Sequence, residues 1–253
     1  MSQRMEKQRA DVLVVERGLA ESRAKAQALI IAGEVVASGG GAGERRVSKP
    51  GEQLRTDSEL RLKGGGLKYV SRGGLKLERA LDHFAVDVHG LQAMDLGAST
   101  GGFTDCLLQR GASSVTAVDV GYGQLHEKLR QDARVRSFER LNARELPEDL
   151  GTYDVLVADL SFISLRVVLP SAVPHVREGG VLILLVKPQF ECGRDWVEKG
   201  GVVKDEAARR RAVTDVGQAL RALGCELLGD VESPLKGPAG NVEFLIAARR
   251  GVR

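Results

Sequence analysis

The stretch AMDLGASTGGFTD, Ala93 to Asp105, decides how the rest of the chain is interpreted. It starts with apolar residues typical of a buried strand, passes through a turn of small residues and resumes as an amphipathic helix. Glycines in such a turn let the backbone approach a ligand closely. A strand, a small-residue turn and a helix in this order are typical of a nucleotide-like cofactor site at the carboxyl end of a parallel strand. The alternative is an ordinary tight turn between a strand and a helix.

Apolar strands and helices alternate on both sides of this loop. The predicted strands are residues 91–97, 114–121, 135–143, 153–162, 181–190, 225–234 and 240–250. The predicted helices are residues 71–84, 101–111, 123–132, 165–180 and 204–224. This alternation predicts an α/β fold with a Rossmann-like, mostly parallel sheet and helices on both faces. Because no helix separates the last two strands, we expect the final strand to be antiparallel.

The first part of the chain has a different pattern and predicts a separate, small α+β domain. Two helices are expected, within residues 9–20 and 21–33, and Ser22 is a candidate N-cap with Gly33 as the C-terminal stop of the second. Short strands are expected at residues 34–39 and 53–62. The run KGGGLK then has the composition of a linker. We therefore predict an N-terminal domain at residues 1–63, a linker at 64–70 and a catalytic domain at 71–253.

Composition and charge exclude several classes of protein. The net charge of +3 and the pI of about 8.8 permit nucleic-acid binding without demanding it. The three cysteines form no CxxC pair, so a disulfide framework or a zinc site is not expected. The N-terminus is charged, and the longest aliphatic run, VLILLV, is far shorter than a membrane span of roughly 18 residues. These features predict a soluble cytoplasmic protein without a membrane segment.

The details of the glycine-rich loop favour one cofactor. Asp119 ends the next strand about 20 residues after the loop, where an acid binds ribose hydroxyls. Ser99 stands where the dinucleotide fingerprint has its second glycine, and no GxxxxGK[ST] phosphate loop exists. Asp95 suits a cationic amino group better than a pyrophosphate. We therefore predict S-adenosyl-L-methionine, bound by Asp95, Gly97, Ala98, Ser99, Thr100, Gly101, Gly102, Phe103, Asp119 and Asn142. Asn142 has two readings of equal weight, a residue beside the adenine or a turn asparagine.

Four charged residues occupy positions where apolar residues are expected. They are Lys76 in a helix, Asp159 and Lys187 at the ends of two strands, and Glu243 between Val242 and Phe244. Each alone fits a solvated strand end. Together, at the carboxyl edge of the sheet that carries the loop, they predict a buried Lys/Asp/Lys/Glu cluster.

The order of these four residues matches the K-D-K-E tetrad of FtsJ-like ribose 2′-O-methyltransferases. The strings YVSRGGLKLERAL, DLGASTGGFTD, DLSFISL, VKPQFE and SPLKGPAGNVEF further resemble the TlyA-type family, often called haemolysin A, of ribosomal-RNA cytidine 2′-O-methyltransferases. The N-terminal string RADVLVVERGLAESRAKAQALIIAGEV, residues 9–35, resembles the alpha-L RNA-binding domain. This resemblance implies a catalytic tetrad, S-adenosylmethionine, and ribosomal RNA or ribosomal subunits as partner. One departure is LKYV, where relatives carry Arg and Trp before VSRG.

The tetrad suits the chemistry that the resemblance implies. A ribose 2′-hydroxyl is a poor nucleophile and must lose its proton as it attacks a methyl carbon. Lys187 can take this proton only as a neutral amine, a form that burial and a second cation such as Lys76 both favour. Asp159 would orient Lys187, while Lys76 and Glu243 support substrate and charge. The sulfonium group supplies the driving force, so no metal is expected.

Basic residues in the N-terminal part predict RNA contacts. Arg9, Arg23 and Lys25 are the best candidates for phosphate binding, although solvated surface charge is the alternative for most basic residues there.

Three other functions compete with ribose methylation: a pore-forming haemolysin, an RNA-binding protein without catalysis, and a methyltransferase for bases or proteins. A pore-forming haemolysin is disfavoured because the sequence contains no membrane segment. A protein that only binds RNA has no need for a lysine at the end of a central strand. Methylation of bases or proteins is disfavoured because ADLSF stands where base methyltransferases carry an N/D-P-P-[YF] motif.

Overall fold

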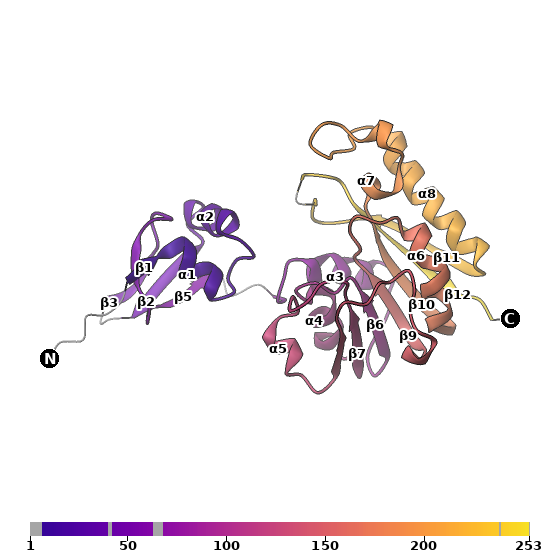
Figure 1. Ribbon diagram of the computed structural model, residues 1–253, viewed down its shortest axis with the longest axis horizontal. Helices are drawn as coiled ribbons and strands as arrows, with labels where there is room; N and C mark the ends of the chain where they lie inside the picture. The colour runs from indigo at the N-terminus through magenta and orange to yellow at the C-terminus, as the bar shows by residue number, and fades with distance from the viewer. Residues whose placement is uncertain (1–6, 40–41, 63–67, 238, 253) are drawn as a thin grey trace. The chain divides into compact units, whose positions relative to one another are not determined.

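The chain forms two compact units, Met1–Lys68 and Tyr69–Arg253. The computed structural model describes residues 7–39, 42–62, 68–237 and 239–252 (Figure 1). Most of the predicted linker, residues 64–67, lies outside the described residues. The division between the units nevertheless falls inside the predicted linker range of 64–70. The RNA-binding character of the first unit stays a prediction.

The first unit is a small α+β structure. Its elements are β1 (Lys7–Arg9), α1 (Ala10–Glu16), α2 (Arg23–Ile31), β2 (Val35–Gly39), β3 (Ala42–Arg46), β4 (Gln53–Arg55) and β5 (Glu59–Leu62). β2 lies between β3 and β5 in an antiparallel sheet, and β1 pairs with β4. The predicted caps are confirmed: the Ser22 hydroxyl accepts from the Lys25 amide, and Gly33 follows the helix with a φ of +74°.

The second unit contains a seven-stranded sheet in the order β11-β12-β10-β9-β6-β7-β8. Its strands are β6 (Gln92–Leu96), β7 (Ser114–Val118), β8 (Val135–Phe138), β9 (Tyr153–Ala158), β10 (Val176–Val186), β11 (Cys225–Glu232) and β12 (Phe244–Arg250). The pairs among β6 to β10 are parallel, whereas β12 is antiparallel to both β10 and β11. The predicted mostly parallel sheet with an antiparallel final strand is therefore confirmed.

Helices cover both faces of this sheet. They are α3 (Gly73–His83), α4 (Gly102–Gln109), α5 (Glu127–Arg130), α6 (Leu165–Ala172), α7 (Pro188–Glu191) and α8 (Glu206–Ala222). Leu77 of α3 and Leu107 of α4 belong to one apolar core, which includes Ile183 of β10. The neighbouring Leu182 points to the opposite face, as strand alternation requires, and joins α6 and α8 in a second core. The two cores hold the strands whose ends carry the predicted site, and Figure 1 shows the helices on either side of the sheet.

Two predicted helices are shorter in the structure. The helix expected at residues 165–180 ends as α6 at Ala172, and Pro174, which has no amide hydrogen to continue the helical bonding, lies in the 3-10 turn Val173–His175 that follows. Residues 176–180 begin β10 instead, and the strand register shifts between Val176 and Val181. The helix expected at 123–132 is reduced to α5. Its first residues make other bonds: Gly123 donates to Glu139, and His126 donates to the Thr100 carbonyl.

Candidate active site

A cavity of about 470 Å³ opens at the carboxyl edge of the parallel strands. Its wall combines the turn after β6, the segment after β7, the segment after β8 and the loop after β9. The lining residues include Gly97, Ser99, Asp119, Gln124, Asn142, Arg144, Asp159, Ser161 and Phe162, with the apolar Val118, Val120, Leu141, Ala143, Leu160 and Ile163. A volume of this size is typical of small-molecule sites.

Asp119 joins the glycine-rich turn to the segment after β7. Its Oδ2 accepts from the Ser99 amide at 2.8 Å, and its Oδ1 accepts from the Gly121 amide at 2.7 Å. These bonds hold the carboxylate at the cavity wall, and each oxygen keeps further acceptor capacity for a ligand. Gly97 leaves room beside the next loop, since a Cβ there would lie only 2.6 Å from the Asp159 carbonyl oxygen.

Asn142 forms the bond of a turn asparagine and also lines the cavity, so its contact with adenine stays a prediction. Its Oδ1 accepts from the Arg144 amide at 3.1 Å, which is the bond of a turn asparagine. It also lines the cavity, among apolar side chains from several loops. Its amide NH₂ group keeps two donors that the turn does not use.

The structure brings only some of the predicted cofactor residues to this cavity. Gly97, Ser99, Asp119 and Asn142 line it, while Ala98 lines a small hollow next to it. The other predicted residues are not among those that line the cavity; they lie in β6, in the turn after it or at the start of α4, and they are Asp95, Thr100, Gly101, Gly102 and Phe103. Gly101 caps α4 with a φ of +98°.

Asp95 is fully buried beneath the turn. The Thr104 hydroxyl donates to its Oδ2 at 2.7 Å, while its Oδ1 has no hydrogen-bond partner among the described residues. Burial raises the pKa of Asp95 to about 7, the Thr104 bond opposes this rise, and the nearby Asp159 adds to it. The carboxyl group therefore changes charge near neutral pH.

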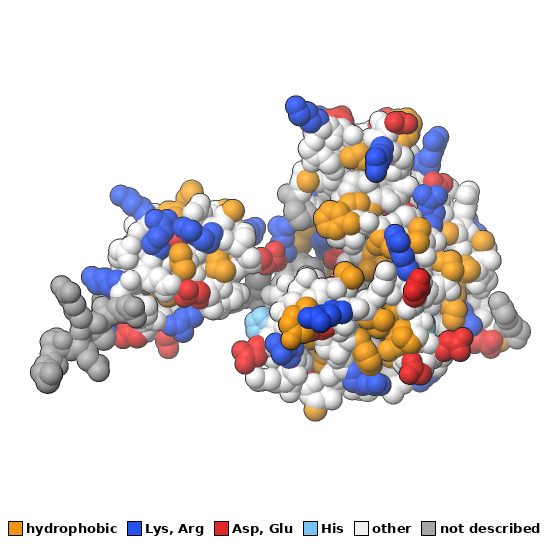
Figure 2. Space-filling model, viewed as in Figure 1, with side chains coloured by type: hydrophobic (Ala, Val, Ile, Leu, Met, Phe, Trp, Pro, Cys, Tyr) orange, Lys and Arg blue, Asp and Glu red, His pale blue; other side chains and the backbone are white. Residues whose placement is uncertain are grey.

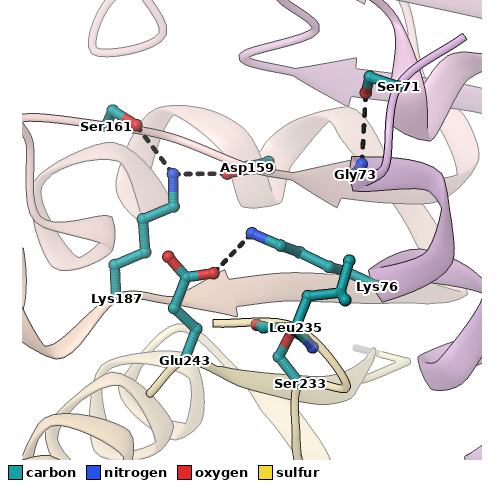
Figure 3. A network of polar contacts seen from close by, with 9 residues as sticks. All are labelled: Ser71, Gly73, Lys76, Asp159, Ser161, Lys187, Ser233, Leu235 and Glu243. Carbon is teal, nitrogen blue, oxygen red and sulfur yellow. Dashed lines mark hydrogen bonds and ion pairs between the residues drawn. The ribbon is translucent and has the colours of Figure 1, made fainter. Parts of the chain in front are cut away.

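The four predicted catalytic residues form two ion pairs (Figure 3). Lys187 Nζ lies 2.6 Å from Asp159 Oδ1, and Lys76 Nζ lies 2.6 Å from Glu243 Oε2. In the figure the Glu243 carboxylate lies between the two lysine side chains, which approach from opposite sides. The Lys76–Glu243 pair is buried, and the side chains of Lys187 and Asp159 are 12% and 23% exposed. The four residues therefore lie together as one buried and one partly buried pair, and their catalytic roles stay a prediction.

The loop after β9 supplies residues that the sequence interpretation missed. The Ser161 hydroxyl accepts from Lys187 Nζ at 2.8 Å. Phe162 has a φ of +64° and is 91% exposed, and its ring lies 5.3 Å from that of Phe190, just after Lys187. An exposed aromatic residue in a left-handed conformation beside a cavity is a candidate contact for substrate. Both residues belong to the string DLSFISL, but the pattern of apolar residues in the sequence gives no reason to expect a role for either of them.

In the first unit, two of the predicted RNA-binding arginines share one buried carboxylate. Arg9 donates from Nε and Nη2 to the two oxygens of Asp11 at 2.9 Å, and Arg23 Nη2 donates to Asp11 Oδ2 at 3.1 Å. Gln27 donates to the same oxygen. Asp11 is fully buried, and the hydrogen bonds from Arg9 hold its pKa well below its usual range. The arginine side chains remain about half exposed, and Lys25 is exposed.

Figure 2 shows Lys and Arg side chains gathered near α2 on the first unit, whereas basic and acidic side chains intermix on the second. None of the helices in the described ranges combines the length and the apolar character needed to cross a bilayer. The described part of the chain also holds no group of three His, Cys, Asp or Glu side chains arranged to bind a metal ion.

The chain is similar to known proteins over most of its length. YqxC of Bacillus subtilis strain 168 is 48% identical over 243 residues, covering 95% of this chain and 85% of YqxC. A protein of Mycobacterium tuberculosis strain H37Rv, named 16S/23S rRNA (cytidine-2′-O)-methyltransferase TlyA, is 46% identical over 95% of this chain and 89% of its own length. A solved structure from Streptococcus thermophilus, described as a hemolysin, is 43% identical, with a TM-score of 0.77 over 98% of this chain and 90% of that one.

A family model matches the same unit that holds the cavity and the two ion pairs. The FtsJ-like methyltransferase model covers residues 69–250. The predicted resemblance to the TlyA-type proteins is thereby confirmed, and so is the Rossmann-like fold. The chain belongs to the FtsJ-like methyltransferase family.

Proposed function

We propose that this protein transfers a methyl group from S-adenosyl-L-methionine to the 2′-hydroxyl of a cytidine in ribosomal RNA. One observation carries the proposal: Asp159 lines the cavity and at the same time pairs with Lys187. The cofactor cavity and the lysine that handles a proton therefore share one wall, as a direct transfer between two bound substrates requires.

The chain's own residues fit S-adenosylmethionine. Asp119 offers acceptor oxygens for ribose hydroxyls, and the apolar residues around Asn142 suit a flat purine ring. Gly97 keeps the β6 turn and the Asp159 loop too close for any side chain between them. Asp95 Oδ1 is a buried acceptor without a partner among the described residues, in β6 just before the turn whose Gly97 and Ser99 line the cavity.

The tetrad supplies the acid–base chemistry. When bound, the cofactor provides an electrophilic methyl group on a sulfonium. Lys187 Nζ takes the proton that the ribose hydroxyl loses as its oxygen bonds to the methyl carbon, while the bond from that carbon to sulfur breaks and leaves a neutral thioether. Asp159 and the Ser161 hydroxyl hold Nζ in place, and the Asp159 carboxylate stabilises the ammonium that forms. Under this proposal, the buried Lys76–Glu243 pair supplies a second set of donors and acceptors for the reacting hydroxyl.

The proposed substrate follows from the relatives and from the first unit. The Mycobacterium tuberculosis relative is named for cytidine methylation in 16S and 23S rRNA. The Arg9–Asp11–Arg23 arrangement presents two oriented guanidinium groups, which suit RNA phosphates. Such contacts give affinity and register, while the tetrad determines which hydroxyl reacts.

The test measures transfer of labelled methyl groups from S-adenosylmethionine to purified small and large ribosomal subunits that lack the modification. We expect label on ribose with the wild-type protein and none with Lys187→Ala, while the variant still binds cofactor. Lys204→Ala serves as a control, because that lysine is 70% exposed in a surface pair with Glu198. Label on neither subunit, with cofactor bound normally, would favour RNA binding without catalysis.

A further inference from the structure

We infer that Glu191 is a positioning residue that fastens the loop carrying Asp159 to the turn carrying Lys187. The inference rests on the proposed function, because it concerns the alignment of that Asp–Lys pair. Glu191 is the last residue of α7, four positions after Lys187, and it is not one of the described residues that line the cavity. Its influence on the reaction would therefore be indirect.

The side chain of Glu191 connects the segment after Lys187 to the start of α6, which follows the Asp159 loop. Its Oε2 accepts from the Ser164 hydroxyl at 2.5 Å, and its Oε1 accepts from the Leu165 amide at 2.7 Å. Arg166 Nη2 donates to the Glu191 carbonyl at 2.9 Å, and Arg166 Nε lies 3.6 Å from Oε2. Three consecutive residues after the Asp159 loop are thus tied to one residue of the Lys187 turn.

The position of this carboxylate explains how it can be buried. The side chain is 2% exposed. Burial raises the pKa of Glu191, and the bonds from Ser164 and Leu165 oppose that rise. The carboxylate lies at the N-terminus of α6, where the Leu165 amide has no partner within the helix. This amide and the helix dipole stabilise the negative charge. A buried acid with these partners is a firm anchor, since breaking it leaves buried donors unsatisfied.

The anchored loop is short and strained. At one end, the Asp159 amide donates to the Leu96 carbonyl at 3.0 Å, and at the other end Ser164 is held by Glu191. Between them Phe162 has a φ of +64°, a strained conformation for a residue with a side chain, which persists only when its surroundings enforce it. Without the Glu191 anchor, the loop gains freedom at the end nearest Phe162, and the Asp159 and Ser161 contacts to Lys187 loosen.

This role predicts a specific kinetic signature for Glu191→Gln, which keeps the size of the side chain but removes its charge and one acceptor oxygen. We expect kcat to fall by about tenfold or more, because small misplacements of catalytic groups have effects of this order. The dissociation constant for S-adenosylmethionine and the KM for the ribosomal subunit should rise by a smaller factor than kcat falls, because the loop residues that line the cavity keep their side chains and lose only their alignment with Lys187. Ser164→Ala, which removes one bond only, should lower kcat less.

Asp205→Asn provides a matched control. Asp205 caps α8, where its carboxylate accepts from the Ala208 amide at 2.7 Å. Loss of either acid weakens a helix N-terminus, so both variants should lower the melting temperature. Only Glu191→Gln should lower kcat. Equal kcat in both variants, or a parallel loss of cofactor affinity and kcat in Glu191→Gln, would overturn the positioning role.

Hydrogen exchange separates this inference from the proposed function. Backbone amides of residues 160–165 should exchange faster in Glu191→Gln than in the wild type. In Asp205→Asn the same amides should exchange at the wild-type rate. If the wild-type protein methylates no ribosomal RNA, the proposed function fails, yet the exchange experiment still applies. Unchanged protection of residues 160–165 in Glu191→Gln would then refute the anchor.

Discussion

Among single residues, Asp95 has the clearest consequence for stability. Burial raises its pKa to about 7, from an ordinary value of 3.8. Between these values the folded protein holds a proton that the unfolded chain has released. The free energy of unfolding should therefore fall as pH rises through this window, with a slope approaching about 1.4 kcal/mol per pH unit, and level off above it.

Asp95→Asn tests this effect directly. Asparagine keeps an oxygen for the Thr104 hydroxyl and cannot ionise. We expect the variant to gain stability relative to the wild type as the pH rises from about 4 to about 7 in denaturant titrations without cofactor. Subtracting the two curves cancels the titration of all other groups. A difference that does not change with pH would show that Asp95 titrates normally.

Phe162 should show opposite effects on stability and activity. Its left-handed conformation suits glycine, so Phe162→Gly should leave the melting temperature equal or higher. The exposed ring beside Ser161 is available to stack on a nucleobase, a contact of about 1–3 kcal/mol. The variant should therefore lose about tenfold or more in kcat/KM for the ribosomal subunit. Full activity with unchanged stability would show that the ring has no role in substrate binding.

At the scale of elements, the turn between β6 and α4 depends on close backbone approach. Gly97 and Gly90 have nearly equal φ values of +79° and +74°, but only at Gly97 would a Cβ meet backbone, 2.6 Å from the Asp159 carbonyl oxygen. Gly90→Ala should cost only the conformational strain, on the order of 1 kcal/mol. Gly97→Ala should cost more and also weaken S-adenosylmethionine binding. Calorimetry on both variants checks this, and equal losses would contradict it.

The elements themselves were largely predictable where the pattern was strong. Alternating apolar strands and helices predicted the parallel sheet, and the missing helix after Cys225–Glu232 predicted the antiparallel β12. The errors arose where tertiary bonds replace local ones. The His126 backbone amide donates to the Thr100 carbonyl instead of joining a longer helix. The helix α6 ends at Ala172, two residues before Pro174. The short β1 and β3 were missed because strands of this length carry little periodicity.

The candidate site was predictable in part, for a physical reason. Charged residues at the ends of buried strands violate the apolar pattern, which made Asp159 and Lys187 visible in the sequence. Ser161 and Glu191 escaped notice because a polar residue in a loop violates nothing. Asp11 lies in the first turn of a predicted helix, where an acid is ordinary, and nothing in the sequence indicates that Arg9 and Arg23 share its carboxylate.

At the scale of the whole molecule, the two units have separate cores. Leu13, Ile30 and Val35 belong to a core within the first unit, and the two larger cores contain only residues of the second. A surface substitution in one unit should therefore leave the folding of the other unchanged. Under the proposed function, RNA affinity and methyl transfer can be altered independently.

Arg23→Gln tests this separation. Arg23 is 58% exposed, and Asp11 keeps its two bonds from Arg9 in the variant. If the arginines bind phosphate, the KM for the ribosomal subunit should rise by about tenfold, and the slope of log affinity against log salt should decrease by about one. The kcat and the dissociation constant for S-adenosylmethionine should not change.

Arg61→Gln is the appropriate control, because Arg61 lies in the same unit and its pair with Glu44 is about half exposed on both sides. Exposed pairs contribute little to stability, so this variant should fold normally and retain both the KM and the salt slope. A rise in KM with both variants would point to general surface charge as the cause. A rise with Arg23→Gln alone would assign RNA binding to the guanidinium groups that Asp11 orients.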